Sequence, residues 1–405
     1  MLARSTFILL AALTAIASPP AAQAKRYTLR VPTFEVPAGK NREICVFVPI
    51  RSKEALDLGK IRIANRVADH GKPGAFATHH LIVYAYRGPL DAVKAGVVKD
   101  DTACLNFGRG RPNDLSIVAT SQGFNSLWVT PHGTALKLTP DTDTSGKPVV
   151  GLVLNSHWIN GDTKPRRARA KVTFITRKPK EVIRELKPIF EVVANAFIDV
   201  PPGETRKVGW DWGPGRTDLA DLTGFLGGAG YPEGGGACVT MLIGHTHKRG
   251  TLFTADLVDQ AGARTQLYEQ TSYSDPRAKL YTPPLLITAG QRIAYECTHD
   301  NATHPRLGCE EAPGAAPGLS VLEALGKGGA SFTNPSGAAK LCTVEGPSPG
   351  ECPPADDAFP GRTFTGNCVQ AKLVFGFTSE DDMCILPGYY YDADMTAPPG
   401  QECTL

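Results

Sequence analysis

The sequence predicts an all-β fold made of two consecutive antiparallel β-sandwich, jelly-roll-like domains. Short runs in which apolar and polar residues alternate recur along the chain, as at residues 27–31, and this pattern is typical of strands with one buried face. The chain also has 42 glycines and 33 prolines, which favours strands and turns over helices. Its 405 residues allow about two domains. The net charge of +3 does not indicate a nucleic-acid partner.

The N-terminus has the pattern of a secretory signal peptide. Arg4 supplies a positive charge, residues 7–17 form a short apolar run, and residues 22–24 (Ala-Gln-Ala) match a cleavage site. The apolar run is too short to span a bilayer, and no later run is long enough. We therefore expect residues 1–24 to be removed and the mature protein to be secreted or periplasmic, without a transmembrane segment.

The first domain is predicted to span residues 25–185. Apolar alternation predicts its strands, whereas residues 52–58 suggest one or two helical turns and residues 89–95 a short helix. A charged stretch over 178–187 connects this domain to the next, and we place the boundary near residue 185. The expected strands lie at 27–31, 43–48, 77–86, 149–158 and 166–176.

The second domain is predicted to span residues 186–405. A tight turn at residues 201–204 (Pro-Pro-Gly-Glu) opens it, and Ala289-Gly290 marks a second turn. Residues 305–367 are rich in glycine, proline and alanine and interrupt the strand pattern, which predicts a long insertion stapled by disulfides. The expected strands lie near 206–211, 237–247, 251–258, 264–270, 283–288 and 292–298, and strand character returns over 370–392.

The chain contains ten cysteines, all of them after the predicted cleavage site. An even number of cysteines in an exported protein indicates disulfides. No Cys-x-x-Cys occurs, which argues against a zinc ribbon or a thioredoxin-like motif.

Histidines in or beside predicted strands are the first candidate metal ligands. His245 and His247 are two apart on one strand, so they share a face and lie about 7 Å apart along it. His79 and His80 are adjacent and would face opposite ways on a regular strand, so joint ligation needs a bulge or a strand end. His157 ends another strand of the same half. The alternative interpretation is that these are ordinary core and surface histidines.

Met383 lies in a polar and acidic surround, residues 379–384, which is unusual for a methionine that only fills a core. A thioether is a soft ligand that selects Cu(I) over zinc or magnesium. Two imidazoles with one thioether would leave an open position on copper. Core packing is the alternative role of Met383. We interpret Asp381 and Asp382 as solvated turn residues rather than an acid/base pair.

These motifs, taken in order, resemble the copper type II, ascorbate-dependent monooxygenases, the family that contains peptidylglycine α-hydroxylating and dopamine β-monooxygenases. Each motif has a counterpart in the family, and the resemblance covers most of residues 27–403 apart from the insertion. The matching segments are His79-His80, the strand at 153–158 that carries His157, the turn at 201–204, His245-Thr246-His247 and the methionine segment 380–384.

The resemblance implies two copper ions with different tasks. The copper on His79, His80 and His157 would store and deliver an electron. The copper on His245, His247 and Met383 would bind O2 and hydroxylate a C–H bond of a small organic substrate, with ascorbate as the reductant. In the family the two sites face each other across an open, solvent-filled cleft.

The resemblance also implies a disulfide scheme. It pairs Cys45 with Cys104, Cys238 with Cys403 and Cys297 with Cys384. The four cysteines of the insertion would then pair among themselves, with their connectivity left open: Cys309, Cys342, Cys352 and Cys368.

Three departures from the amidating members bear on the substrate. Ile243 replaces an arginine, and Ile385 and Pro387 replace an asparagine and a tyrosine that hold the peptide carboxylate. We therefore do not expect a peptide with a C-terminal glycine as substrate, and the isoleucines suggest a less polar one. Two other functions stay open: a non-catalytic copper carrier or store on the same scaffold, and a disulfide-rich adhesion module with structural histidines.

Overall fold

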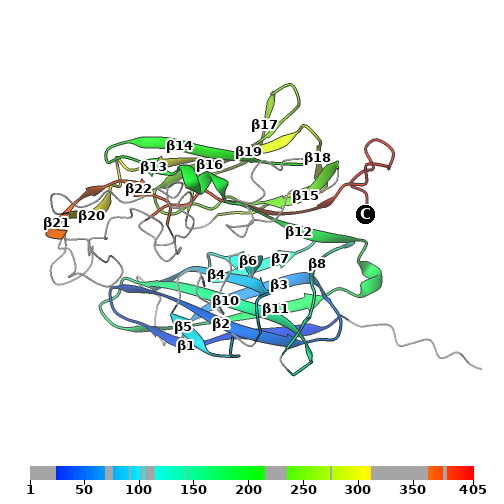
Figure 1. Ribbon diagram of the computed structural model, residues 1–405, viewed down its shortest axis with the longest axis horizontal. Helices are drawn as coiled ribbons and strands as arrows, with labels where there is room; N and C mark the ends of the chain where they lie inside the picture. Colours follow the sequence, from blue (N-terminus) through cyan, green and yellow to red (C-terminus); the bar gives the residue numbers. More distant parts are fainter. Residues whose placement is uncertain are drawn as a thin grey trace, which may run out of the picture.

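The fold is built from β-strands and connecting turns. The computed structural model describes residues 24–68, 76–90, 93–100, 104, 115–143, 145–214, 235–273, 276–311, 364–376 and 381–405. Within these residues the helical segments are the short 3-10 helices η4 (Pro179–Glu181) and η5 (Val193–Phe197). The expected all-β sandwich fold is confirmed. Figure 1 shows the two halves of the chain as two layered bodies, one above the other.

The first half is a sandwich of two sheets. A six-stranded sheet has the order β5-β2-β10-β4-β6, with β9 paired to β10, and it faces the strands β1-β11-β3-β8, with β7 paired to β3. Apolar side chains such as Leu58, Ile63 and Val172 fill the space between the sheets. The strands are β1 (Arg26–Val36), β2 (Lys40–Arg51), β3 (Leu56–Val67), β4 (Phe76–Tyr86), β5 (Val98–Asp100), β6 (Leu115–Ser121), β7 (Asn125–Val129), β8 (Thr134–Leu138), β9 (Asp141–Thr142), β10 (Pro148–Asn160) and β11 (Arg166–Thr176).

The second half is a second sandwich with its own core. The strands β12-β23-β15-β18 face a four-stranded sheet of order β14-β19-β16-β17, and Trp212, Phe253 and Tyr295 lie in the core between them. The strands are β12 (Arg184–Glu191), β13 (Asp199–Val200), β14 (Thr205–Trp212), β15 (Gly236–Leu242), β16 (Gly250–Val258), β17 (Arg264–Gln270), β18 (Lys279–Thr288), β19 (Arg292–Asp300), β20 (Arg306–Glu311), β21 (Phe364–Ala371), β22 (Leu373–Val374) and β23 (Leu386–Asp392).

Strand β12 joins the two halves into one continuous sheet. It pairs in parallel with β8 of the first half, at Arg184 opposite Thr134, and antiparallel with β23 of the second, at Lys187 opposite Tyr390. The resulting nine-stranded sheet runs through the whole molecule. The predicted domain boundary near residue 185 therefore falls inside a strand that belongs to both halves.

Several local predictions were wrong. Residues 52–58 form no helix, and β3 begins at Leu56 instead. The described residues of 89–95 are also not helical. Strand β15 ends at Leu242, five residues before the predicted end at 247. Both predicted turns are confirmed, and Gly290 adopts the positive φ of 84° that its turn requires.

The described residues contain the three disulfides expected from the resemblance: Cys45–Cys104, Cys238–Cys403 and Cys297–Cys384. At the base of the insertion, Cys309 of β20 stands opposite Cys368 of β21, and Cys368 is disulfide-bonded. Cys342, Cys352 and the signal-peptide residues 1–23 lie outside the described residues.

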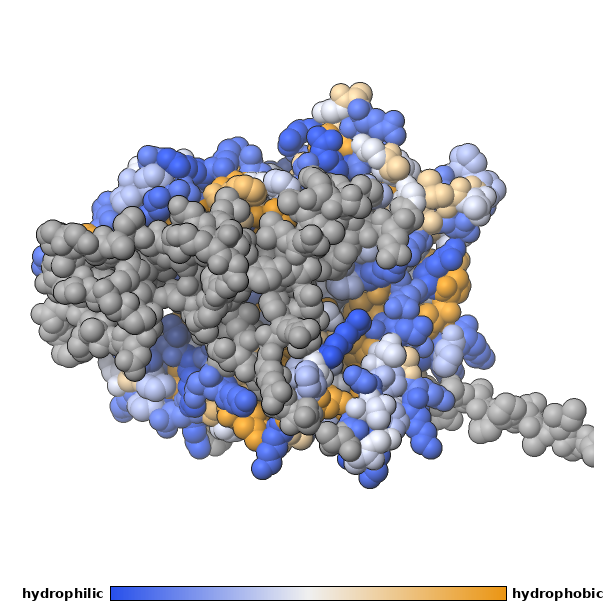
Figure 2. Space-filling model, viewed as in Figure 1, coloured by the Kyte–Doolittle hydropathy of each residue, from blue (hydrophilic) through white to orange (hydrophobic). Residues whose placement is uncertain are grey.

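The disulfides are typical of proteins from oxidising compartments. None of the helices in the described residues has the length and apolar character needed to cross a membrane. Hydrophilic residues cover much of the described surface in Figure 2, and hydrophobic atoms reach the surface between the two halves at the right of the view.

Candidate metal centre

Three of the predicted ligands, His79, His80 and His157, form one compact group. They come from the neighbouring strands β4 and β10, and one ring nitrogen of each lies within 4.8 Å of the others. The ring centroids are 4.9 to 5.2 Å apart. Three imidazoles so close together, and free to share one ion, have the arrangement of a three-histidine metal site.

A β-bulge in β4 places His79 beside His80. His80 stands opposite His157, but the next pair along the ladder joins Trp158 to Thr78. His79 is therefore the extra residue of the bulge, with no partner on β10. A bulge breaks the alternation of faces, which allows two consecutive side chains to lie on the same side. The bulge that joint ligation requires is thus present at the expected residues.

The sequence analysis missed Glu43, a buried carboxylate in the same group. On β2, Glu43 stands directly opposite His157, so its side chain lies on the face that carries the histidines. One carboxylate oxygen is 3.5 Å from His80 Nε2 and the other 3.8 Å from His157 Nδ1, with 8% of the side chain exposed. The signal was present in the sequence, since a charged residue opens a run that is otherwise apolar.

Asn155 connects Glu43 to His80. Its amide nitrogen donates to Glu43 Oε1 at 2.7 Å, so its Oδ1 accepts from His80 Nε2, also at 2.7 Å. This network makes Nε2 the protonated nitrogen of His80 and leaves the Nδ1 lone pair available to a metal. Asn155 and Glu43 therefore fix the orientation of one of the three imidazoles.

The other two histidines, the half-buried His79 and the buried His157, are neutral. Burial lowers the pKa of His157 to about 4, and burial together with the neighbouring histidines lowers the pKa of His79 far below its usual value. Among the described residues none forms a hydrogen bond with His79 Nε2 or with either ring nitrogen of His157. Buried polar atoms are normally paired. Neutral, unpaired ring nitrogens are therefore well suited to a metal ion.

The second group comprises His245, His247 and Met383. Although β15 ends at Leu242, the chain stays extended, and His245 exchanges two backbone hydrogen bonds of 3.0 Å with Ile385. The two imidazole centroids are 5.3 Å apart. Gly244 lies against the Phe253 ring, and a Cβ there would come within 2.5 Å of that ring. Met383 lines the same cavity as both histidines.

Asp382 supports this second group, and its predicted role as a solvated turn residue was wrong. It is fully buried, and its Oδ1 accepts hydrogen bonds from the backbone nitrogens of His247 and Met383, each at 2.8 Å. Burial alone would raise its pKa, but His299, 3.2 Å away, and His247 outweigh that effect and lower the pKa. One carboxylate thus anchors both ligand-bearing segments.

The neighbouring residues hold the methionine segment in place. Asp381 is also buried, again contrary to prediction, and is paired with Arg306 at 2.8 Å. Its backbone oxygen accepts from His247 Nδ1 at 3.1 Å, which leaves Nε2 of that imidazole available. The Cys297–Cys384 disulfide then attaches the residue after Met383 to strand β19.

The two groups lie side by side in this structure. The rings of His79 and His247 are 5.4 Å apart, and one small cavity of about 110 Å³ is lined by Glu43 and His80 from the first half and by His245, His247 and Met383 from the second. The open, solvent-filled cleft that the family resemblance implied does not separate them. Ile243, Ile385 and Pro387 line the same cavity and form an apolar part of its wall.

Comparison with protein-family models and with curated proteins finds no match to this chain. Among solved structures, the chain is similar to one described as the structure of the Macrobrachium rosenbergii nodavirus, with 11% identity over 69% of this chain and 93% of that chain. The TM-score of that match is 0.19, and it carries no argument about fold or function here.

Proposed function

We propose that this protein is an exported, copper-dependent monooxygenase that hydroxylates a C–H bond of a small organic substrate. The observation that carries the proposal is the pair of ligand-capable groups beside one cavity. One group offers only imidazole nitrogens, and the other combines two imidazoles with the Met383 thioether. Imidazole and thioether together favour copper over zinc, calcium or magnesium.

The donor sets fit two copper ions. His79, His80 and His157 would hold the first, and the unpaired ring nitrogens of His79 and His157 favour this role. His245, His247 and Met383 would hold the second. When bound, the copper ions would supply electron storage and oxygen activation, with ascorbate or another reductant as the electron source.

The overall reaction balances with one oxygen molecule and two electrons. One oxygen atom enters the C–H bond and forms the hydroxyl group, and the other leaves as water after the reductant delivers two electrons and two protons. The chain itself would position the substrate against the apolar wall of Ile243, Ile385 and Pro387. The signal-peptide pattern and the three disulfides support a secreted or periplasmic location.

Substitution of Met383 tests the function most directly. We expect Met383→Ala to reduce substrate-dependent oxygen uptake with ascorbate by at least about 100-fold, because loss of a ligand should cost at least as much as loss of its supporting residues. Met395→Ala is the matched control, since Met395 is 45% exposed and lies outside the cavity. Equal turnover in the two variants would contradict the proposal.

Copper analysis separates the alternatives. Two copper ions per chain after loading, together with substrate-linked oxygen uptake, would support the monooxygenase. Stoichiometric copper without oxygen uptake across a broad substrate panel would indicate the carrier or storage function. A chain that retains no copper after loading would favour structural histidines in an adhesion module.

A further inference from the structure

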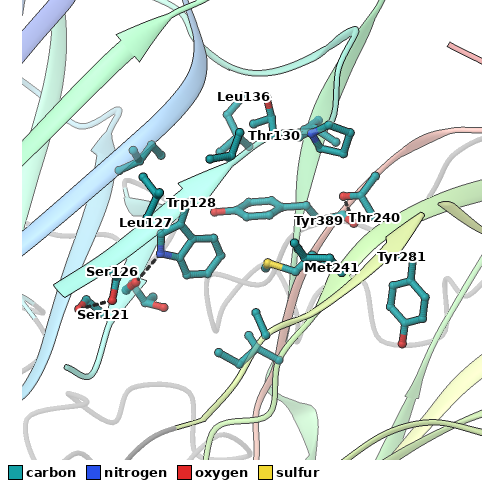
Figure 3. Close-up of a pocket in the computed structure, with 18 of the residues that line it drawn as sticks. Ser121, Ser126, Leu127, Trp128, Thr130, Leu136, Thr240, Met241, Tyr281 and Tyr389 are labelled. Atoms are coloured by element: carbon teal, nitrogen blue, oxygen red, sulfur yellow. Dashed lines mark hydrogen bonds between the residues drawn. The ribbon is translucent and has the colours of Figure 1, made fainter. Parts of the chain in front are cut away.

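A second, larger cavity adjoins the candidate metal centre. Its volume is about 610 Å³, which lies in the range that holds small organic ligands. Its walls come from β6, β7 and β8 of the first half and from β15, β18 and β23 of the second. Figure 3 shows Trp128 on the β7 side facing Met241 and Tyr389 on the other.

The lining of this cavity is uncharged. Among the described residues that line it there is no aspartate, glutamate, lysine, arginine or histidine. Along the segment before β18 and the start of that strand, Pro276, Ala278 and Leu280 line the cavity, whereas the intervening Arg277 and Lys279 do not. The lining therefore selects against ionic groups, because burying an unpaired charge is costly.

Several polar side chains of the lining are already paired within the protein. Trp128 Nε1 donates to the Thr120 carbonyl at 2.9 Å, and Thr240 Oγ1 donates to the Tyr389 carbonyl at 3.1 Å. The Tyr389 hydroxyl donates to the Val118 carbonyl at 2.5 Å. Figure 3 shows the first two of these bonds at the cavity wall. With these donors occupied, the cavity offers mainly apolar contact.

The larger cavity and the small cavity of the metal centre share part of their walls. Thr120, Gln122 and Ile243 line both the larger cavity and the small cavity that contains His245, His247 and Met383. The Ile243 end of the larger cavity therefore lies next to the second copper group. Leu127, Val129 and Leu280 also line the larger cavity and are 58%, 52% and 66% exposed, which gives it an apolar rim. Exposed apolar side chains around a cleft are typical of ligand sites.

We propose that the larger cavity binds a neutral, predominantly apolar organic molecule, and that this molecule is the hydroxylation substrate, with its reacting C–H at the Ile243 end. The substrate assignment rests on the proposed function. The binding assignment rests only on the cavity, because its volume, its uncharged lining and its position beside the copper ligands do not depend on a bound metal.

Binding to the metal-free mature chain tests the cavity without copper chemistry. The probes are neutral N-phenyl-1-naphthylamine and its anionic counterpart 1-anilinonaphthalene-8-sulfonate, which share a ring skeleton and differ in charge. We expect saturable binding of one neutral probe per chain, at least about ten-fold tighter than the anionic probe, because the lining cannot pair a sulfonate. Equal or tighter binding of the anionic probe would overturn the proposal.

Matched tryptophan substitutions locate the probe. Ala278 is exposed and lines the cavity, so Ala278→Trp should fill part of it and weaken neutral-probe binding by about ten-fold or more. Ala263 is also exposed but lies in the turn between β16 and β17, so Ala263→Trp should leave the affinity unchanged. Equal effects of the two substitutions would contradict the location.

Energy transfer gives a second readout that does not depend on a filled cavity. Excitation of Trp128, which lines the cavity, should transfer energy to the bound neutral probe, and Trp128→Phe should remove much of that transfer. Transfer that is unchanged in Trp128→Phe would place the probe elsewhere and overturn the assignment.

Turnover separates this proposal from the proposed function. If the copper-loaded protein hydroxylates carboxylate-bearing compounds but no neutral ones, the proposed substrate class is wrong. The proposed monooxygenase function would still hold. A protein that binds the neutral probe in the cavity but consumes no oxygen with any compound would overturn the function and the substrate assignment together, while the binding site would remain.

Discussion

At the scale of single residues, two buried carboxylates support the two histidine groups. Glu43 lies beside His80 and His157, and Asp382 holds the backbone at His247 and Met383. A buried carboxylate is costly unless its charge is balanced. Glu43 faces His80 and His157, Asp382 faces His299, and a bound cation would balance the charge of each carboxylate. Such supporting groups orient metal ligands and adjust the electronic properties of the metal.

Removal of the Glu43 charge tests its role. We expect Glu43→Gln to weaken Cu(II) binding at the three-histidine group by about 10- to 100-fold, as the loss of supporting residues does at other metal sites. Cu(I) affinity should fall less, because a smaller charge has to be balanced, so the reduction potential should rise. Competition with chelators for each copper state and a redox titration would measure both effects.

Glu185→Gln is the control, since Glu185 is 49% exposed and pairs only at the surface with Lys137, 3.3 Å away. It removes the same charge without touching the histidines. If the Glu43 and Glu185 variants have the same Cu(II) affinity and the same reduction potential, Glu43 has no role at the metal.

At the scale of elements, two irregular features bring the ligands together. The bulge in β4 turns His79 onto the face of His80 and His157. The Cys297–Cys384 disulfide closes a sequence separation of 87 residues and ties the segment of Met383 to β19. A disulfide stabilises the fold mainly by constraining the unfolded chain. This one also restricts how far Met383 can move from His245 and His247.

Removal of this disulfide should affect both stability and copper binding. We expect Cys297→Ser with Cys384→Ser to lower the free energy of unfolding by about 2–5 kcal/mol. It should also weaken Cu(I) binding at the methionine site, because Met383 would lose a covalent support one residue away. Urea unfolding and competition with a Cu(I) chelator would measure the two effects.

The Cys238–Cys403 pair provides the comparison. It closes a longer separation of 165 residues, so its removal should destabilise the fold at least as much in the loop-entropy account. It does not adjoin a ligand, so Cu(I) affinity should be preserved. Equal losses of Cu(I) affinity in both double variants would show that the effect comes from general destabilisation.

At the scale of the whole molecule, the two halves share a β-sheet and part of a hydrophobic core. Strand β12 pairs with both of them, and the core of the first half includes Met241, Tyr389 and Tyr391 from the second. The trace in Figure 1 shows β12 lying between the two bodies. The contact between His79 and His247 and the large apolar cavity both follow from this close packing.

A shared sheet and a shared core should make the protein unfold as one unit. We expect a single calorimetric transition whose calorimetric and van't Hoff enthalpies agree, since neither half can unfold without exposing the core of the other. Scanning calorimetry of the metal-free mature protein would measure this. Two resolved transitions, or a stable fragment ending near residue 185, would indicate independent domains.

Much of the fold could be predicted from local patterns in the sequence. Short strand-like runs predicted β4, β10 and β11 at nearly their observed positions, and in β11 the signal was the alternation of basic and apolar residues, which is a local property of a strand. The prediction was wrong at β3, because residues 52–58 were interpreted as helical although the strand begins at Leu56. Short polar stretches carry weak signals, and pairing with β11 and β8 decides that structure.

The sequence by itself determined the strand character, the cysteine content and the types of ligand available, because these depend on residue identity and short spacing. Tertiary structure alone decided that His79 occupies a bulge, that Glu43 reaches His80 and His157, and that the two ligand groups share one cavity. Each of these features joins segments far apart in the chain. Such contacts arise from the register of strands and the packing of sheets, which no local pattern of residues encodes.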